Sequence, residues 1–189
     1  MSLIGRIHRK SYDLPYQAHY LTFSCFQRQP FFKSQRAPLW FKESLEAAQT
    51  RYPFDLWAYV IMPEHVHLLI LPANGVLIRN ILAAIKQPVT RRALGWIEKN
   101  HPAFLSRMLD LQPNGKCTHR FWQRGGGYDR NQWTAEEIHE KIAYIHANPV
   151  RRKLVENPEE WQWSSHRAWV GGSDVPIQIN RESLPPLVS

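Results

Sequence analysis

The sequence has few cysteines and lacks long apolar segments and repeats, which excludes several classes of protein. It has two cysteines, Cys25 and Cys117, in 189 residues, which is too few for a disulfide framework and suits reduced thiols. It has no apolar run long enough to cross a bilayer, and residues 1–10 lack the apolar core of a signal peptide. No internal repeat and no low-complexity tract interrupts it. We therefore expect a cytoplasmic protein with no membrane contact.

Acidic residues are also scarce relative to basic ones. The chain carries 16 Asp and Glu against 24 Lys and Arg, a formal net charge of +8. Such a balance favours a polyanionic partner, above all a nucleic acid. Hydrophobic residues make up 43% and there are eight tryptophans, which is typical of a packed globular protein. The length predicts one domain over residues 1–155 and a partly irregular tail over 156–189.

Apolar spacing along the chain predicts the order of the elements. Period-two alternation and β-branched or aromatic content indicate strands, and spacing of three to four residues indicates helices. We expect strands over 19–26, 54–61, 65–71 and 118–124, and helices over 38–51, from about 76 onward, and over 134–148.

Prolines and one capping pattern limit these helices. Pro88 should kink or interrupt the second helix, and Pro149 should limit the end of the third. Thr134 and Glu137 match the capping box that opens a helix. The order β-α-β-β-α-β plus a further helix predicts an α+β, ferredoxin-like (RRM-like) sandwich, in which helices pack on an antiparallel sheet. A C-terminal tail follows.

A pair of histidines stands in the third predicted strand. His65 and His67 are separated by Val66 alone, so both imidazoles point to the same face of the strand. Burying two unpaired imidazoles together is costly unless each has a partner. Two imidazoles at this separation can bind one metal ion together, and satisfied core or surface histidines are the other interpretation.

The helix over 134–148 carries a second candidate group. Ile138, Ile142 and Ile145 form its apolar stripe. Tyr144 and Asn148 lie off that stripe, one turn apart on the same face. A phenol and an amide oxygen can therefore reach one site together.

Three segments together resemble a known family. They are V-I-M-P-E-H-V-H over residues 60–67, Y-I-H-A-N-P-V-R over 144–151 and W-Q-W-S-S over 161–165. In combination they resemble the single-tyrosine transposases of the HUH endonuclease superfamily. They are most similar to the REP-associated tyrosine transposases, which are linked to repeated extragenic palindromes. The resemblance runs from roughly residue 18 to 169.

This resemblance implies a fold and a chemistry. The histidine pair would lie on a central strand facing the tyrosine helix, and the activity would be metal-dependent nicking of single-stranded DNA hairpins by a monomer or homodimer. Tyr144 would be the nucleophile and form a 5′-phosphotyrosine intermediate, with Mg²⁺ or Mn²⁺ held by His65, His67 and Asn148. A phenol with a pKa of about 10 needs a polarised phosphate to attack, which a metal ion supplies. Because the linkage keeps the bond energy, the step can be reversed to join strands.

Some assignments remain open at this point. Many relatives in the superfamily carry Gln where this chain has Asn148, which is one methylene shorter, so direct and water-mediated ligation are both possible. Glu140, one turn before Tyr144, is a substitute ligand or a solvated surface group. Tyr128 and Gln132 imitate the spacing of a tyrosine and its amide, so Tyr128 is a competing nucleophile or a residue that shapes a loop near DNA.

Two further histidines, His119 and His146, lead to different expectations. Cys117 and His119 have the same alternation as the histidine pair and could join it in a zinc site, although the spacing typical of structural zinc is absent. His146 points to the far side of the helix from Asn148, as a packing or surface residue would.

Basic and aromatic residues supply the candidates for DNA contact. Cations track phosphates, and Phe121, Trp122 or Trp163 could stack on unpaired bases. The cationic candidates are Lys86, Arg91, Arg92, Arg120, Arg124, Arg130, Arg151, Arg152 and Lys153. Two other functions compete with the nuclease: a non-catalytic RRM-like nucleic-acid-binding protein, and a metal-dependent hydrolase of small phosphoesters.

Overall fold

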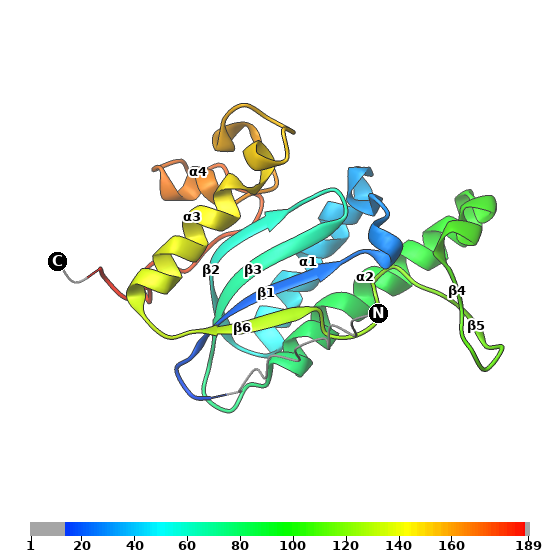
Figure 1. Cartoon of the computed structure of the whole chain (residues 1–189), viewed down its shortest axis with the longest axis horizontal. Coiled ribbons are helices and arrows are strands. Elements are labelled where there is room, and N and C mark those ends of the chain that lie inside the picture. Colours follow the sequence, from blue (N-terminus) through cyan, green and yellow to red (C-terminus); the bar gives the residue numbers. More distant parts are fainter. Residues whose placement is uncertain (1–13, 188–189) are drawn as a thin grey trace, which may run out of the picture.

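A computed structural model describes residues 14–187 of the chain. Its centre is a four-stranded antiparallel sheet in the order β2-β3-β1-β6, with helices on both faces (Figure 1). This is the predicted ferredoxin-like arrangement, and the fold class is confirmed. The strands of this sheet are β1 (Ala18–Ser24), β2 (Phe54–Ile61), β3 (His65–Pro72) and β6 (Tyr128–Gln132).

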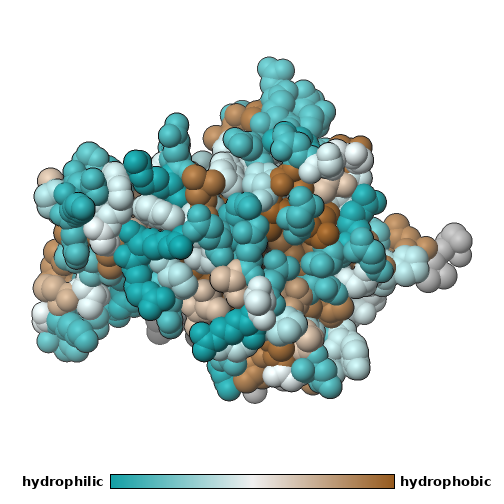
Figure 2. Space-filling model, turned by 180° about the vertical axis from the view of Figure 1, so that it is seen from behind, coloured by the Kyte–Doolittle hydropathy of each residue, from teal (hydrophilic) through white to brown (hydrophobic). Residues whose placement is uncertain are grey.

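Helices α1 (Arg36–Arg51) and α2 (Ile78–Asn100) cover one face of the sheet. The alternate residues Leu21 and Phe23 of β1, and Val66 and Leu68 of β3, point into this layer and are almost fully buried. Seen from this side, the surface over the two helices is mainly hydrophilic with apolar patches (Figure 2). The apolar core of this layer therefore lies between the sheet and the two helices.

Helix α3 (Ala135–Arg151) covers the opposite face. Its stripe of Ile138, Ile142 and Ile145 is buried against residues of β1, β2 and β3, as the spacing predicted. The helix starts as expected, since the Glu137 amide donates to Thr134 Oγ1 at 3.2 Å. The Glu137 carboxylate in turn accepts from the Trp133 amide at 2.7 Å, one residue before the cap. These contacts fix the residue at which α3 begins.

The fourth strand is not where the sequence predicted it. Residues 118–124 do not form the sheet edge; β5 (Cys117–His119) pairs instead with β4 (Leu109–Leu111) in a separate ribbon. The edge strand is β6, which follows Gly127 at a φ of +93°. A Cβ at Gly127 would lie 2.3 Å from the Thr22 carbonyl oxygen, so only glycine permits this approach to β1.

Two predicted helix limits also change. Helix α2 runs without interruption through Pro88, because Ile85, Val89 and Ala93 are buried on both sides of it and offset the lost hydrogen bond. Helix α3 continues past Pro149 to Arg151. Its last turn therefore extends the face that bears Tyr144 and Asn148.

The C-terminal segment contains two short helices, a 3-10 turn (Pro158–Glu160) and α4 (His166–Trp169), and is otherwise irregular. It packs along the free edge of β2: the Ile61 amide donates to the Trp163 carbonyl at 2.8 Å, and the Asn180 amide to the Leu56 carbonyl at 2.8 Å. The division at residue 155/156 remains a prediction. Within residues 14–187, no helix has the length and apolar character needed to span a bilayer.

Candidate active site

Polar side chains gather on the face of the sheet that α3 covers. His65 and His67 of β3 point to this face, as alternation predicted, and β1 places Ser24 and Thr22 directly opposite them. All four line one cleft of about 370 Å³. Both histidines are buried, with 6% and 5% of their surface exposed. The cleft therefore has a floor of polar groups from β1 and β3.

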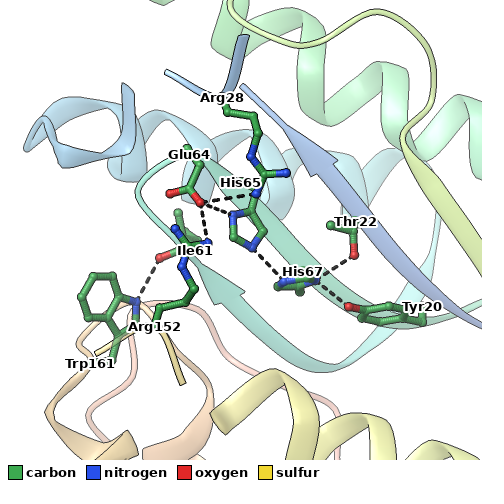
Figure 3. Close-up of polar contacts among 9 residues, drawn as sticks. All are labelled: Tyr20, Thr22, Arg28, Ile61, Glu64, His65, His67, Arg152 and Trp161. Carbon is green, nitrogen blue, oxygen red and sulfur yellow. Dashed lines mark hydrogen bonds and ion pairs between the residues drawn. The ribbon is translucent and has the colours of Figure 1, made fainter. Parts of the chain in front are cut away.

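Hydrogen bonds fix the proton of His65. Its Nδ1 lies 3.1 Å from the Glu64 carboxylate (Figure 3). A carboxylate only accepts, so Nδ1 carries the proton and Nε2 presents a lone pair. This Nε2 lies 2.9 Å from Nε2 of His67. His67 must therefore donate from Nε2 in this arrangement.

His67 can adopt the other tautomer, because its Nδ1 faces two hydroxyl groups. Tyr20 Oη and Thr22 Oγ1 each lie 2.7 Å from it. A hydroxyl donates or accepts, so the same partners can accept a proton from Nδ1 and leave Nε2 with a lone pair. In that tautomer both Nε2 atoms converge as electron donors, which is the arrangement in which histidines ligate a metal.

Electrostatics keep both imidazoles neutral. Burial, helped by the nearby His65 and Lys141, lowers the pKa of His67 to about 3. Burial also lowers the pKa of His65, although the Glu64 carboxylate acts in the opposite direction. Burial raises the pKa of the Tyr20 phenol well above its ordinary value, so it stays protonated. Neutral imidazoles are the form that binds a cation.

Glu64 joins the histidine pair to two arginines. Its carboxylate accepts from Arg152, the residue that follows α3, at 2.8 Å and lies 3.7 Å from Arg28 (Figure 3). Burial alone would raise the pKa of Glu64, but the hydrogen bonds from Arg152 and His65 and the charge of Arg152 hold it below its ordinary value. Glu64 is 7% exposed, whereas both arginines are largely exposed. The buried carboxylate thus ties His65 to two cations at the mouth of the cleft.

Tyr144 lies beside the histidines on α3. Its ring centroid is 6.0 Å from that of His67 and 6.2 Å from that of Tyr20, both edge to face. The side chain is 37% exposed. Lys141 Nζ is 5.1 Å from the ring centroid, and the Arg151 guanidinium lies over the ring at 4.9 Å. The phenol therefore lies at the surface of the cleft between two cations.

Asn148 lines the same cleft, one turn beyond Tyr144. It is 7% exposed, and its Nδ2 donates to the Tyr144 carbonyl at 2.8 Å. This bond turns the amide so that Oδ1 is the group left for a cation. Arg151 and Arg152 complete the wall. The structure thus brings together six of the predicted site residues: His65, His67, Tyr144, Asn148, Arg151 and Arg152.

Other predicted DNA contacts lie away from this cleft. Lys86, Arg91 and Arg92 belong to α2 on the far face of the sheet, where Arg92 pairs with Glu43. Burial lowers the pKa of Lys86 to about 8, and its Nζ donates to the Gly125 carbonyl at 2.9 Å. These residues form no common surface with the histidine pair.

Three other cationic candidates are paired with acids. Arg120 and Arg124 both bind Asp110, Arg124 at 2.8 Å. Arg130 extends from the edge strand β6, opposite Tyr20, and lies 3.7 Å from Glu137.

Two aromatic candidates for base stacking are core residues. Trp122 is 5% exposed and donates from Nε1 to the Lys86 carbonyl, and Phe121 is 2% exposed. A base cannot stack on a buried ring. Phe121 and Trp122 are therefore part of the core, and the expectation that they stack on DNA bases is wrong.

The structure also places the alternative metal ligands and the alternative nucleophile. Within residues 14–187 no group of three or more His, Cys, Asp or Glu side chains could hold a metal ion, so Cys117 and His119 do not join the histidine pair in a zinc site. Glu140 is exposed and does not line the cleft. Tyr128 lies on β6, not in a loop, with its ring centroid 6.0 Å from that of Tyr20.

Sequence reasoning missed several members of the site. Tyr20, Thr22 and Ser24 alternate with the apolar residues of β1, and this signal was available from the period of the strand. Arg28 and Glu64 lacked such a signal, because their contact with each other depends on the path of the chain after β1. Lys141 shares the stripe of Tyr144 but was not named as a DNA contact.

Known proteins resemble this chain over most of its length. The sequence model of the family described as "Transposase IS200 like" matches residues 15–148. A curated protein of Haemophilus influenzae (strain ATCC 51907 / DSM 11121 / KW20 / Rd), named "Putative REP-associated tyrosine transposase", is 28% identical over 149 residues, which cover 73% of this chain and 79% of that protein.

Two solved structures are also similar. One, a REP-associated tyrosine transposase bound to a REP hairpin, gives a TM-score of 0.65 at 18% identity and covers 96% of this chain and 99% of that one. The other, described as a "putative transposase" from Deinococcus radiodurans R1, gives a TM-score of 0.44 at 20% identity over 74% of this chain and 96% of that one. The first supports the fold, and the family match spans both the histidine pair and Tyr144. The chain therefore belongs to the IS200-like transposase family of enzymes.

Proposed function

We propose that the protein is a metal-dependent single-stranded DNA endonuclease and strand transferase that acts on hairpin-forming repeat DNA, with Tyr144 as its nucleophile. One observation carries this proposal. The Nε2 atoms of His65 and His67 meet 2.9 Å apart in a cleft that also contains the exposed Tyr144 and the amide of Asn148. A protein that only binds nucleic acid has no use for this convergence.

The donor groups fit a small divalent cation such as Mg²⁺ or Mn²⁺. His65 and His67 would bind it through Nε2, since both Nδ1 atoms have partners. Because no third His, Cys, Asp or Glu joins them among residues 14–187, the third protein ligand would be Oδ1 of Asn148. Two imidazoles and one amide oxygen suit Mn²⁺ better than Mg²⁺, because Mg²⁺ prefers a site made of oxygen ligands alone. When bound, the cation would polarise the scissile phosphate as a Lewis acid.

The residues of the chain would then perform the transfer. Tyr144 Oη attacks the phosphorus, and a new O–P bond forms as the bond from phosphorus to the 3′ oxygen breaks. The phenol loses a proton and the departing 3′ oxygen gains one, so the products are a 5′-phosphotyrosine and a free 3′ hydroxyl. Attack by a 3′ hydroxyl on this linkage reverses the step and joins two strands.

Three cations around the cleft would hold the DNA backbone. Arg28, Arg151 and Arg152 line the cleft and are exposed, which suits phosphate contact. Lys141 stands beside the phenol, where negative charge develops as its proton leaves. Hairpin DNA as the substrate is supported by the similar transposase that was solved with a REP hairpin.

The identity of the nucleophile is the sharpest test. A hairpin oligonucleotide with single-stranded flanks is incubated with the protein and Mn²⁺, and the covalent adduct is mapped by mass spectrometry. We expect the adduct on the peptide that contains Tyr144, and Tyr144→Phe should lower cleavage by a factor on the order of 10³ or more while leaving hairpin affinity nearly unchanged. Tyr128→Phe is the matched control, because its ring also lies against Tyr20.

Three results would contradict this proposal. An adduct on the Tyr128 peptide would move the nucleophile to β6. Full cleavage by Tyr144→Phe without any adduct would point to a metal-bound water and hydrolysis. Equal affinity for the flanked hairpin and for a plain duplex at matched salt would remove the single-strand specificity.

A further inference from the structure

A second cavity, of about 350 Å³, lies on the helical side of the molecule. It is bounded by the 3-10 turn at Phe31–Lys33, the start of α1, the end of α2, and a second 3-10 segment at Pro102–Met108. Its volume falls within the range of sites that hold small ligands. We refer to it as the aromatic pocket.

Five Phe and Trp rings line the aromatic pocket. Trp40, Trp96 and Phe104 are half-buried and line it from three elements. Phe31 and Phe121 are buried and close its floor, and their ring centroids are 5.1 Å apart. Partly exposed rings in a concave site offer faces on which another planar group can stack.

The rim of the aromatic pocket is positively charged. Lys33, Arg36 and Arg107 are exposed on it, and no Asp or Glu is among the lining residues. The Arg36 guanidinium lies 4.6 Å from the Trp96 ring centroid, and that of Arg107 lies 5.3 Å from Phe104. A guanidinium stacked in this way still presents its N–H edge to an anion. Apolar faces below and cations above suit a ligand that is both planar and anionic.

The aromatic pocket is continuous in sequence with the catalytic cleft. Arg28 lines the cleft, and the next residues, Gln29 and Pro30, line the pocket. Backbone hydrogen bonds hold this connecting segment against the loop before His65: the Cys25 amide donates to the Glu64 carbonyl at 2.9 Å, and the Phe32 amide to the Pro63 carbonyl at 3.0 Å. This short segment therefore joins the wall of the cleft to the wall of the pocket.

We propose that the aromatic pocket binds an unpaired nucleotide in the single-stranded flank of the same DNA strand that enters the catalytic cleft. The base stacks among Trp40, Trp96 and Phe104, and its phosphates contact the cations of the rim. Every nucleobase has an aromatic face, and stacking on protein rings is the usual way to hold a single strand. This inference rests on the proposed function, because it takes the substrate to be single-stranded DNA.

The test measures binding in the Tyr144→Phe background, so that cleavage cannot interfere. The probes are one flanked hairpin and a series in which each flank position in turn is abasic. We expect Trp96→Ala to lower affinity by about 5- to 100-fold. One abasic position should lower the affinity of the Tyr144→Phe protein by the same factor. The same abasic position should not lower the affinity of the Trp96→Ala variant further, because both changes remove the same contact.

Matched variants separate this effect from general damage. Leu39→Ala changes an exposed residue of α1 outside the pocket and should bind as the parent does. Arg107→Gln should reduce the salt dependence of binding, whereas Lys99→Gln, an exposed cation of α2 outside the pocket, should leave it unchanged. If Trp96→Ala does not fold, Trp40→Ala takes its place, and Arg107 at the exposed rim provides an independent measurement.

The failures are distinguishable. The parent here is the Tyr144→Phe protein. If it binds the flanked hairpin, but every abasic position lowers its affinity by the same factor as it lowers the affinity of the Trp96→Ala variant, the pocket assignment is overturned. The proposed function then stands. If the parent is a dimer in sedimentation and Trp96→Ala is a monomer with unchanged DNA affinity, the pocket holds a second copy of the chain, which also overturns it. If the parent binds no hairpin, the proposed function fails as well.

Discussion

Two pairs of histidines in this molecule look alike in isolation. His65 and His67 have ring centroids 4.7 Å apart at 89°, and His146 and His166 have centroids 5.2 Å apart at 79°. In each pair burial lowers the pKa of one member, His67 or His146, to about 3. Neither contact geometry nor pKa distinguishes them.

Their surroundings do distinguish them. The first pair opens on a cleft shared with Tyr144, and its ring nitrogens are bound so that both Nε2 atoms converge. In the second pair, Nε2 of His146 is hydrogen-bonded to the buried Ser165 hydroxyl at 2.8 Å, and its ring packs against Trp169. A lowered histidine pKa therefore indicates burial alone. A functional site is indicated only where the ring nitrogens also converge on a space that a ligand can enter.

Removing the first pair should have the largest effect. We expect His65→Ala/His67→Ala to lose Mn²⁺ binding in calorimetry and to lose cleavage of the flanked hairpin, because both proposed nitrogen ligands are gone. His146→Ala should keep Mn²⁺ binding at the wild-type affinity. If the double variant binds Mn²⁺ as the wild type does, the metal assignment is wrong.

The orienting carboxylate offers a finer comparison, since Glu64 accompanies only the first pair. Glu64→Ala should weaken Mn²⁺ affinity by about 10- to 100-fold, because His65 loses the acceptor that fixes its proton on Nδ1. Glu64→Gln should recover much of that loss, since its amide oxygen can accept the same bond. Equal losses in the two variants, at unchanged thermal stability, would show that the orientation of His65 does not depend on this acceptor.

The second pair should affect the free energy of unfolding. The pKa of His146 is about 3 when folded and near 6.5 when unfolded, so between these values the unfolded chain binds the extra proton and acid favours unfolding. The contribution of neutral His146 to the free energy of unfolding is fully present above pH 6.5. Below that pH it is lost at up to about 1.4 kcal/mol per pH unit.

Urea unfolding in EDTA between pH 7.5 and 5 measures this effect. His146→Gln should show a shallower decline than the wild type, while His67 still contributes in the same direction in both proteins. His166, which faces His146 and lies 3.6 Å from Glu159, is retained in both. Identical slopes would mean that His146 does not titrate between the two states.

Local periodicity made much of the molecule predictable from the sequence. Alternation along residues 65–71 placed both histidines on one face, and the helical repeat separated Ile142 and Ile145 from Tyr144. These relations involve only a few residues of one element, and the structure preserves them. The prediction failed at Phe121 and Trp122, two adjacent residues that are both buried, because period-two alternation does not describe a segment outside the sheet.

The sequence by itself determined which side chains share a face: the histidine pair on β3, and Tyr144 with Asn148 on α3. Only the tertiary structure decided that these two faces meet, since α3 could have packed on either side of the sheet. It also decided the contact of Glu64 with Arg152, across 88 positions of the chain, and the choice of β6 as the edge strand. Such contacts depend on how the whole chain closes around its core, and no local repeat encodes that closure.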